Sequence, residues 1–367
     1  MSAPVSDPAP ARPASRVRLR PAVAALPRYE PGRSAPGAVK LSSNENPEPP
    51  APAVVAAGAR ALESANRYPD MAAAALREAI ADHLGILPEQ VCTGTGSSGV
   101  LLAALSAVCD PSGGHDQVVF PWRSFESYPI AVPTAGGVPV PVPLTPQCRH
   151  DLPALREAIG PRTAAVILCS PNNPTGPALT LAEIRDFIAQ VPPEVLVIVD
   201  EAYIELATDP AVSTAVPLLA ESANVLVLRT FSKVYALAGL RVGYGVGHPD
   251  LIAAIAAVSV PFGVSSVAQT AALAALADQA AVDRSARLIA GERDRVLAAL
   301  RGAGYTVPDS QANFVWLSAD QSGPALVEAC AQAGLLVRPF PEGVRVSVGL
   351  PEDNDRFLAV ARAFRRR

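Results

Sequence analysis

Three short apolar segments constrain the fold more than any other feature of this 367-residue sequence. They cover 164–168, 195–199 and 225–228, and polar residues follow each of them at once. Amphipathic patterns of helical period, such as LAEIRDFIAQ, separate the segments. Apolar runs of this length that alternate with helices are typical of buried strands in a parallel sheet. We therefore expect an α/β fold.

The polar residues that follow these strands include four candidates for a site. Asn173 follows the first strand, Asp200 and Tyr203 follow the second, and Lys233 follows the third. Ligands of open parallel sheets bind at the carboxyl ends of the strands. We expect these four side chains to line one pocket.

The segment around Lys233, NVLVLRTFSKVYALAGLRVGYGVG at 224–247, predicts the ligand. A lysine amine can form a Schiff base with an aldehyde, and the hydroxyls of Thr230 and Ser232 with the guanidinium of Arg241 suit a phosphate. Pyridoxal phosphate carries both groups. An isolated Ser-Lys pair would be better interpreted as a strand end, but the longer pattern S-K-x-x-x-L-x-G-x-R-x-G is far harder to reach by chance.

This pattern resembles the cofactor-lysine segment of fold-type I pyridoxal-phosphate aminotransferases, in particular the histidinol-phosphate and aromatic group. LSSNENP, RYPD, SPNNPTG, DEAY and VRVSVG occur in the order of that group, and the resemblance runs from about Leu19 to the carboxyl terminus. It implies a large domain with a mainly parallel sheet, a smaller α+β domain and a homodimer. We expect a tail at 1–25 that is mobile, an arm at 26–60 that is part of the small domain, a large cofactor domain at 61–270 and a small domain at 271–367.

The resemblance also implies a role for each site residue. Lys233 would hold the cofactor and move protons, Asp200 would face the pyridine nitrogen, and Asn173 and Tyr203 would bond the ring hydroxyl. The phosphate would be bound by Gly96, Ser97, Ser98, Thr230, Ser232 and Arg241, together with Tyr68 of the neighbouring subunit. Arg345 would bind the substrate carboxylate, with Asn44 and Arg338 beside it.

The glycines Gly94, Gly96 and Gly99 leave a second interpretation open. They spell G-x-G-x-x-G before a helical run, which is the dinucleotide fingerprint, and Asp110 or Asp116 would then bind the ribose. The preceding strand is weak, however, and free amides at a glycine-rich helix start bind any phosphate. An oxidoreductase that uses a nicotinamide cofactor therefore stays an alternative.

The segment PWRSFESYP at 121–129 bears on the substrate. Phe125 is our choice for the aromatic ring that stacks on the cofactor, with Trp122 and Tyr128 close behind. The segment is similar to that of actinobacterial-type aromatic aminotransferases, which implies phenylalanine or tyrosine as donor and a 2-oxo acid such as 2-oxoglutarate as acceptor. Histidinol phosphate is the alternative donor, with Arg338 and Arg123 as spare cations, and a decarboxylase on the same scaffold is a remote one.

Composition excludes several other classes. A formal net charge of −4 gives no reason to expect nucleic acid or an anionic membrane as partner. The five cysteines are scattered and the four histidines have no metal-ligand spacing, so we expect free thiols, no metal and a cytoplasmic protein. The uncharged stretch 251–277 is interrupted by polar residues and a Pro-Phe-Gly turn, which indicates two buried helices rather than a membrane span.

Overall fold

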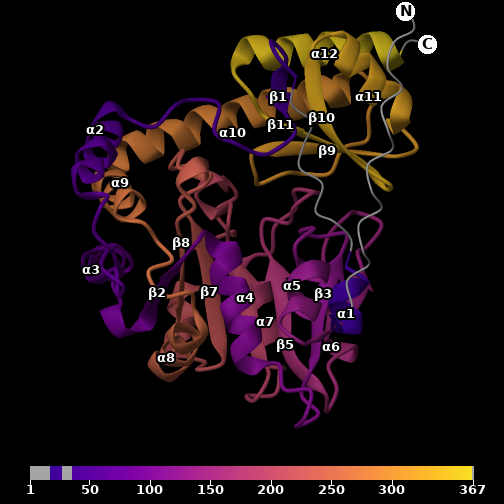
Figure 1. The fold of residues 1–367 in the computed structure, drawn as a ribbon. Coiled ribbons are helices and arrows are strands. Elements are labelled where there is room, and N and C mark those ends of the chain that lie inside the picture. The colour runs from indigo at the N-terminus through magenta and orange to yellow at the C-terminus, as the bar shows by residue number, and fades with distance from the viewer. Residues whose placement is uncertain (1–16, 27–34, 366–367) are drawn as a thin grey trace, which may run out of the picture.

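A computed structural model describes residues 17–26 and 35–365. In Figure 1 a seven-stranded sheet occupies the lower part of the molecule, and a four-stranded sheet with its own helices lies above it. The elements in chain order are α1 (Pro21–Ala24), β1 (Val39–Leu41), α2 (Pro52–Ala61), α3 (Ala74–Leu84), β2 (Val91–Gly94), α4 (Ser97–Val108), β3 (Gln117–Trp122), α5 (Tyr128–Thr134), β4 (Val138–Pro143), α6 (Leu152–Glu157), β5 (Thr163–Cys169), α7 (Leu181–Ile188), β6 (Leu196–Asp200), β7 (Val225–Thr230), β8 (Gly243–Gly247), α8 (Pro249–Val258), α9 (Ser266–Ala277), α10 (Gln279–Gly302), β9 (Phe314–Ser318), α11 (Gly323–Gln332), β10 (Leu335–Phe340), β11 (Gly343–Ser347) and α12 (Pro351–Arg365).

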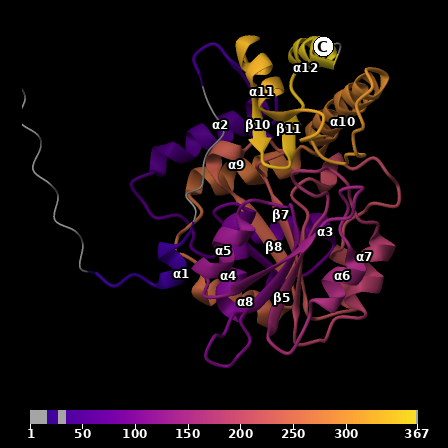
Figure 2. The same cartoon turned by 90° about the vertical axis from the view of Figure 1, so that its right-hand side faces the viewer.

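The large sheet has the strand order β2-β8-β7-β6-β5-β3-β4. Strand β8 is antiparallel to both of its neighbours, and the remaining pairs are parallel. Successive residues of β6 enter different cores: Val197 and Val199 pack in one, and Ile198 packs in the other. Helices α4 and α8 lie on one side of the sheet and α6 and α7 on the other, as Figure 2 shows. Burial on both faces explains the continuous apolar strands and confirms the expected α/β fold.

The small sheet has the order β1-β10-β11-β9, which places β1, from early in the chain, beside strands from its last third. Strand β1 pairs in parallel with β10, with Val39 opposite Leu335. Leu41, Val346 and Phe357 pack in its separate core. This confirms the smaller α+β unit that was expected, while the domain boundaries at 60/61 and 270/271 stay a prediction.

Part of the predicted tail and arm, 1–16 and 27–34, lies outside the described residues. The described stretch 17–26 contains α1, which packs near α5. Arg20 donates hydrogen bonds there to the carbonyl oxygens of Pro133 and Thr134, at 3.0 and 3.1 Å.

Two helical regions show how local chemistry sets element ends. The stretch 251–277 forms α8 and α9 around a turn in which Phe262 has a φ of +58°. The long helix α10 begins at Gln279, because the side chain of Asp278 caps it by accepting from the amide of Ala281 at 3.0 Å. No helix within 17–26 and 35–365 is long and apolar enough to cross a membrane.

Candidate active site

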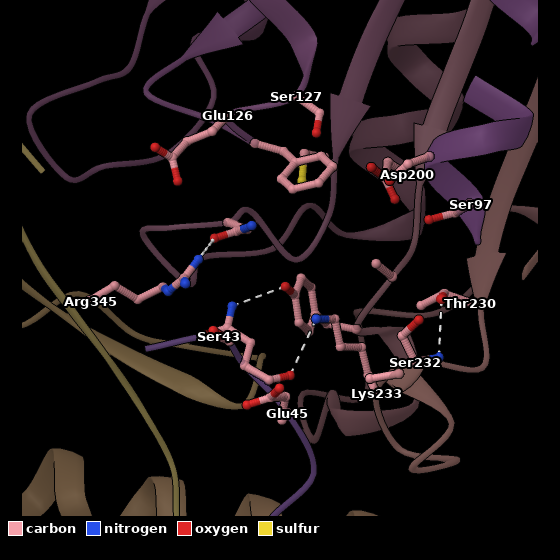
Figure 3. Close-up of a pocket in the computed structure, with 18 of the residues that line it drawn as sticks. Ser43, Glu45, Ser97, Glu126, Ser127, Asp200, Thr230, Ser232, Lys233 and Arg345 are labelled. Atoms are coloured by element: carbon pink, nitrogen blue, oxygen red, sulfur yellow. Dashed lines mark hydrogen bonds between the residues drawn. The ribbon is translucent and has the colours of Figure 1, made fainter. Parts of the chain in front are cut away.

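A pocket of about 470 Å³ lies at the carboxyl ends of β5, β6 and β7, where the small sheet meets the large one. It brings together all of the predicted site residues except Gly96 and Tyr68. Those lining it are Asn44, Ser97, Ser98, Phe125, Asn173, Asp200, Tyr203, Thr230, Ser232, Lys233, Arg241, Arg338 and Arg345. Figure 3 shows Lys233 near the middle, with Asp200, Thr230 and Ser232 toward one side and Arg345 toward the other.

Lys233 follows β7 and is half-buried. Its Nζ donates a hydrogen bond to the carbonyl oxygen of Asn44 at 3.2 Å and lies 5.4 Å from the centre of the Tyr203 ring. Burial, assisted by the charge of Arg345, lowers the pKa of Lys233 to about 8. The neutral amine, which is the nucleophilic and basic form, is therefore more populated than in a free lysine.

Asp200 ends β6 and is 4% exposed. Its Oδ2 accepts a hydrogen bond from the hydroxyl of Tyr128 at 2.8 Å, whereas Oδ1 is buried without a partner. Burial raises the pKa of Asp200, against the opposing effects of the Tyr128 hydroxyl, the backbone amide of Ala202 and the charge of Lys233. Buried polar atoms are almost always hydrogen-bonded. An N–H donor from a ligand, such as a protonated pyridine nitrogen, fits this oxygen.

An anion site lies where α4 begins. Ser97 and Ser98 form the first turn of α4, whose free amides favour a phosphate. Arg241 donates from Nη1 to Ser232 Oγ at 3.3 Å. A Cβ atom on Gly96 would lie only 2.7 Å from Arg241 Nη2. The absence of a side chain at Gly96 therefore lets the guanidinium of Arg241 lie close to the backbone there. A helix start, hydroxyls and a guanidinium at one place fit the phosphate of pyridoxal phosphate.

Two arginines lie at the other end of the pocket. Arg345 is 6% exposed and donates to Asn173 Oδ1 at 2.5 Å and to the carbonyl oxygen of Ser42 at 2.6 Å. Arg338 donates from Nη2 to both oxygens of Glu126, each at 3.0 Å.

The expectation that Arg338 and Arg123 are spare cations is wrong. Arg338 pairs with Glu126, and Arg123 makes a two-point ion pair with Glu342 at 2.8 and 2.9 Å. Each glutamate lies more than 200 positions from its arginine in the sequence. The segments around Arg338 and Arg123 therefore gave no sign of a partner.

The three aromatic residues of PWRSFESYP lie in three different environments. Phe125 lines the pocket. Tyr128 is fully buried, its ring lies edge-on to that of Phe125 with the ring centres 5.6 Å apart, and its hydroxyl donates the hydrogen bond to Asp200. Trp122 is not among the lining residues, and the guanidinium of Arg123 stacks 4.2 Å from its ring centre.

Several lining residues were not named individually from the sequence, namely Ser42, Ser43, Glu45, Glu126, Ser127, Cys169, Ala202 and Ala238. Five of them had a signal. Ser42, Ser43 and Glu45 lie beside Asn44 in the LSSNENP segment, Glu126 is the chain neighbour of Phe125, and Cys169 is the last residue of β5. The predicted Tyr68 lies outside this pocket, 83% exposed, with its ring 4.8 Å from that of Phe262.

The dinucleotide interpretation does not fit the geometry. Asp110 lies beyond the far end of α4, which at about 1.5 Å per residue places it roughly 18 Å from the glycine turn. Asp116 is bonded to Arg162 by contacts of 2.8 and 3.1 Å. Within the described residues, no cluster of three or more His, Cys, Asp or Glu side chains is arranged to hold a metal ion.

Comparisons with known proteins agree on one family. A family model described as aminotransferase class I and II matches residues 36–361. An aromatic amino acid aminotransferase of Streptomyces avermitilis is 48% identical over 355 residues, covering 95% of this chain and 98% of that protein. One of Thermobifida fusca is 47% identical over 354 residues, with the same coverage. The histidinol-phosphate aminotransferase of Sinorhizobium meliloti, solved in complex with pyridoxal-5'-phosphate, superposes with a TM-score of 0.85 at 29% identity, covering 96% of this chain and 98% of that one.

The family model covers most of the chain, and the relatives match along almost their whole length. The pocket that unites Lys233, Asp200 and Arg241 therefore belongs to an enzyme that transfers nitrogenous groups, and the chain is a member of the aminotransferase class I and II family.

Proposed function

We propose that this protein is a pyridoxal-phosphate-dependent aminotransferase that moves the amino group between phenylalanine or tyrosine and a 2-oxo acid such as 2-oxoglutarate. Relatives at 48% identity bear the name aromatic amino acid aminotransferase. The observation that carries the proposal is the partnerless buried Oδ1 of Asp200, which shares one pocket with the amine of Lys233.

Different residues would bind different parts of the cofactor. Lys233 Nζ would hold its aldehyde carbon, and Asp200 Oδ1 would accept from its ring nitrogen. Ser97, Ser232 and Arg241 would bind its phosphate, with Ser98, Thr230 and Gly96 completing that end of the site. When bound, pyridoxal phosphate takes up the amino group and draws electrons from the α-carbon of the substrate.

The protein's own groups then control the proton and the substrate. Lys233 Nζ, with its pKa lowered to about 8, would act as the base that shuttles the proton between the substrate α-carbon and the cofactor. Asp200 keeps the ring nitrogen protonated. Arg345 binds the α-carboxylate through its planar guanidinium, next to Asn173. Phe125 covers the ring and offers an apolar surface to an aromatic side chain.

Histidinol phosphate is the second candidate donor, favoured by the likeness to solved histidinol-phosphate aminotransferases. A dianionic phosphate needs cations that are not already neutralised, because burying it otherwise is costly. Both Arg338 and Arg123 pair with glutamates. This pairing supports the aromatic donor.

Two measurements test the proposal. Borohydride reduction of the holoenzyme should attach pyridoxal phosphate to the peptide that contains Lys233, and Lys233→Ala should lose the label. The ratio of kcat/KM for phenylalanine to that for histidinol phosphate should favour phenylalanine. A preference of about tenfold or more for histidinol phosphate, roughly 1.4 kcal/mol, would overturn the aromatic assignment.

We also propose that the protein is a cytoplasmic homodimer in which Tyr68 completes the phosphate site of the neighbouring subunit. The surface around Tyr68 supports the dimer, because Met71, Val260 and Phe262 are also exposed there, at 64%, 75% and 40%. Met71 and Val260 also line a groove of about 770 Å³. Exposed apolar patches of this kind mark interfaces. The five free cysteines support a reducing compartment.

Mixing subunits tests the dimer. Lys233→Ala subunits lack the amine but keep Tyr68, and Tyr68→Phe subunits keep the amine. If Tyr68 acts across the interface, mixed dimers should recover activity that neither parent shows. A monomer in sedimentation that retains full activity would contradict the proposal.

A further inference from the structure

Asn44, which follows β1 in the chain, lines the pocket although every one of its polar groups is hydrogen-bonded to protein. The residue is 1% exposed. Its carbonyl oxygen accepts from Lys233 Nζ at 3.2 Å and from Asn313 Nδ2 at 3.1 Å. Its backbone amide and its side chain contact Ser347 and Tyr203. Asn44 therefore connects Lys233 and Tyr203 to the end of β11.

The contact with Ser347 fixes the orientation of the Asn44 side-chain amide. The Ser347 hydroxyl oxygen accepts from the backbone amide of Asn44 at 2.8 Å, and the hydroxyl donates its proton to Asn44 Oδ1, also at 2.8 Å. Ser347 is 3% exposed, and a buried donor without an acceptor is costly. Turning the amide over would remove the one acceptor that this hydroxyl has within 17–26 and 35–365. Oδ1 therefore faces Ser347, and Nδ2 faces Tyr203.

The bond from Asn44 to Tyr203 sets the direction of the Tyr203 hydroxyl. Asn44 Nδ2 lies 3.0 Å from that hydroxyl, and an amide nitrogen can only donate, so the Tyr203 oxygen accepts. Burial raises the pKa of Tyr203, against the charge of Arg345 and the hydrogen bond from Asn44, so the hydroxyl keeps its proton at neutral pH. That proton points away from Asn44. Because Tyr203 lines the pocket, its hydroxyl is available there as a donor.

A donor at this place fits one part of pyridoxal phosphate. The ring hydroxyl of that cofactor is next to its aldehyde carbon, and the Tyr203 ring centre lies 5.4 Å from the Lys233 amine that would hold the aldehyde. Figure 3 shows Lys233 extending toward the segment that carries Ser43 and Glu45, in which Asn44 lies. A hydrogen bond donated to the ring oxygen stabilises its anionic form.

We propose that Asn44 is a positioning residue, which holds the Tyr203 hydroxyl as a donor toward the ring oxygen of the cofactor, while Ser347 fixes the direction of the Asn44 amide. This inference rests on the proposed function, because it takes pyridoxal phosphate as the ligand and Tyr203 as the partner of its ring hydroxyl. Asn44 acts through Tyr203, since its own polar groups are already bonded.

The test removes the side-chain amide by Asn44→Gly and compares two cofactors. Asn44 has a φ of +53°, which glycine adopts readily, and the backbone groups that bond Lys233 and Ser347 stay in place. Cofactor-free protein is titrated with pyridoxal phosphate and with 3-deoxypyridoxal phosphate, which lacks only the ring hydroxyl. The preference for pyridoxal phosphate, taken as the ratio of the two dissociation constants, should fall by about fivefold or more.

The absorbance of the bound cofactor gives a second readout. Its pH midpoint should rise by about half a unit or more in Asn44→Gly, because the negative charge of the ring oxygen then lacks its oriented donor. Neither readout should change further when Asn44→Gly is added to Tyr203→Phe, since the hydroxyl through which Asn44 acts is gone.

Two further variants separate this effect from a general loosening of the segment. Asn44→Asp keeps the size of the side chain but offers Tyr203 only acceptors, so the preference should fall at least as far, and this variant carries the test if Asn44→Gly does not fold. Asn46→Ala removes bonds from the same segment to the carbonyl oxygen of Val234 and to Ser285 Oγ, and Asn46 is not among the lining residues. It should leave the preference within about twofold of the wild type.

The outcomes distinguish the inference from the proposed function. If Asn44→Gly changes the preference by less than about twofold, or lowers it equally in the Tyr203→Phe background, the inference is overturned, even where the wild type turns over phenylalanine as proposed. If the preference depends on Asn44 as expected while the wild type favours histidinol phosphate in turnover, the aromatic assignment fails and the role of Asn44 stands.

Discussion

Arg229→Met should be among the most destabilising single substitutions in the large sheet, because it leaves a buried carboxylate without its partner. Arg229 precedes Thr230 at the end of β7, and its side chain is 8% exposed. Its Nε lies 3.1 Å from Glu201, and its Nη1 lies 2.6 Å from Glu205. Glu201 directly follows Asp200, and its side chain is 1% exposed. The cluster thus ties together the strand ends that carry the site.

The magnitude follows from the burial of Glu201. Breaking a buried ion pair from one side costs about 3–5 kcal/mol, because the remaining charge stays desolvated. Glu201 keeps two hydrogen bonds, from the amide of Ala215 and the hydroxyl of Thr214, but these do not replace a full charge. As control, Arg185→Met removes the partner of Glu221. Both side chains are about half exposed, at 46% and 49%, so that loss should stay within about 1 kcal/mol.

The loss of stability in Arg229→Met should also depend on pH. Burial raises the pKa of Glu201 above its ordinary value near 4.5, and the charge of Arg229 opposes the rise. Without Arg229 the folded-state pKa rises further, so the folded protein binds the proton more tightly than the unfolded chain. Stability then falls as pH rises from the unfolded value through the folded pKa. The deficit of Arg229→Met should be larger at pH 7 than at pH 5.

Urea unfolding of the holoenzyme at both pH values measures the deficit. Adding Glu201→Gln to Arg229→Met removes the stranded charge and should recover at least half of the loss at pH 7. The reasoning is refuted if Arg229→Met is no more destabilising than Arg185→Met, or if the deficit is the same at both pH values.

Two other predictions follow from the site itself. In cofactor-free protein, the pKa of Lys233 is lowered to about 8, whereas in the unfolded chain it has its ordinary value of 10.5. Between these two pH values the unfolded chain binds more protons than the folded protein, so the stability of the wild type should rise with pH. Lys233→Met should lack this rise when the melting temperature is measured across the same pH range. Gly96→Ala should weaken retention of pyridoxal phosphate by roughly tenfold, because its methyl group displaces Arg241. Gly85→Ala, at a similar φ of +67° but in open space, should cost about 1 kcal/mol of stability and leave retention unchanged in equilibrium dialysis.

The large sheet was predictable because its signal is local. Val197, Ile198 and Val199 are buried on both faces, and that double burial appears directly as an uninterrupted apolar run. Ligand-facing residues at the ends of such runs, as with Asp200 and Lys233, follow from the topology of parallel sheets. The pairing of Val39 with Leu335 was harder to predict from the sequence, because a strand of three residues is too short to show a periodic apolar pattern.

The roles of residues that depend on a distant partner could not be predicted from the sequence. Tyr128 was a candidate pocket wall, yet its hydroxyl bonds Asp200, which lies 72 positions further along the chain. Arg338 was read as a free cation because its partner, Glu126, lies 212 positions away. In both cases the residue type was informative, but hydrogen-bond satisfaction decides its chemistry, and satisfaction is a property of the folded pocket. The same logic works in reverse at Asp200. Its Oδ1 is buried without a hydrogen-bond partner, and an N–H donor from a ligand would satisfy it; the DEAY motif alone does not reveal this.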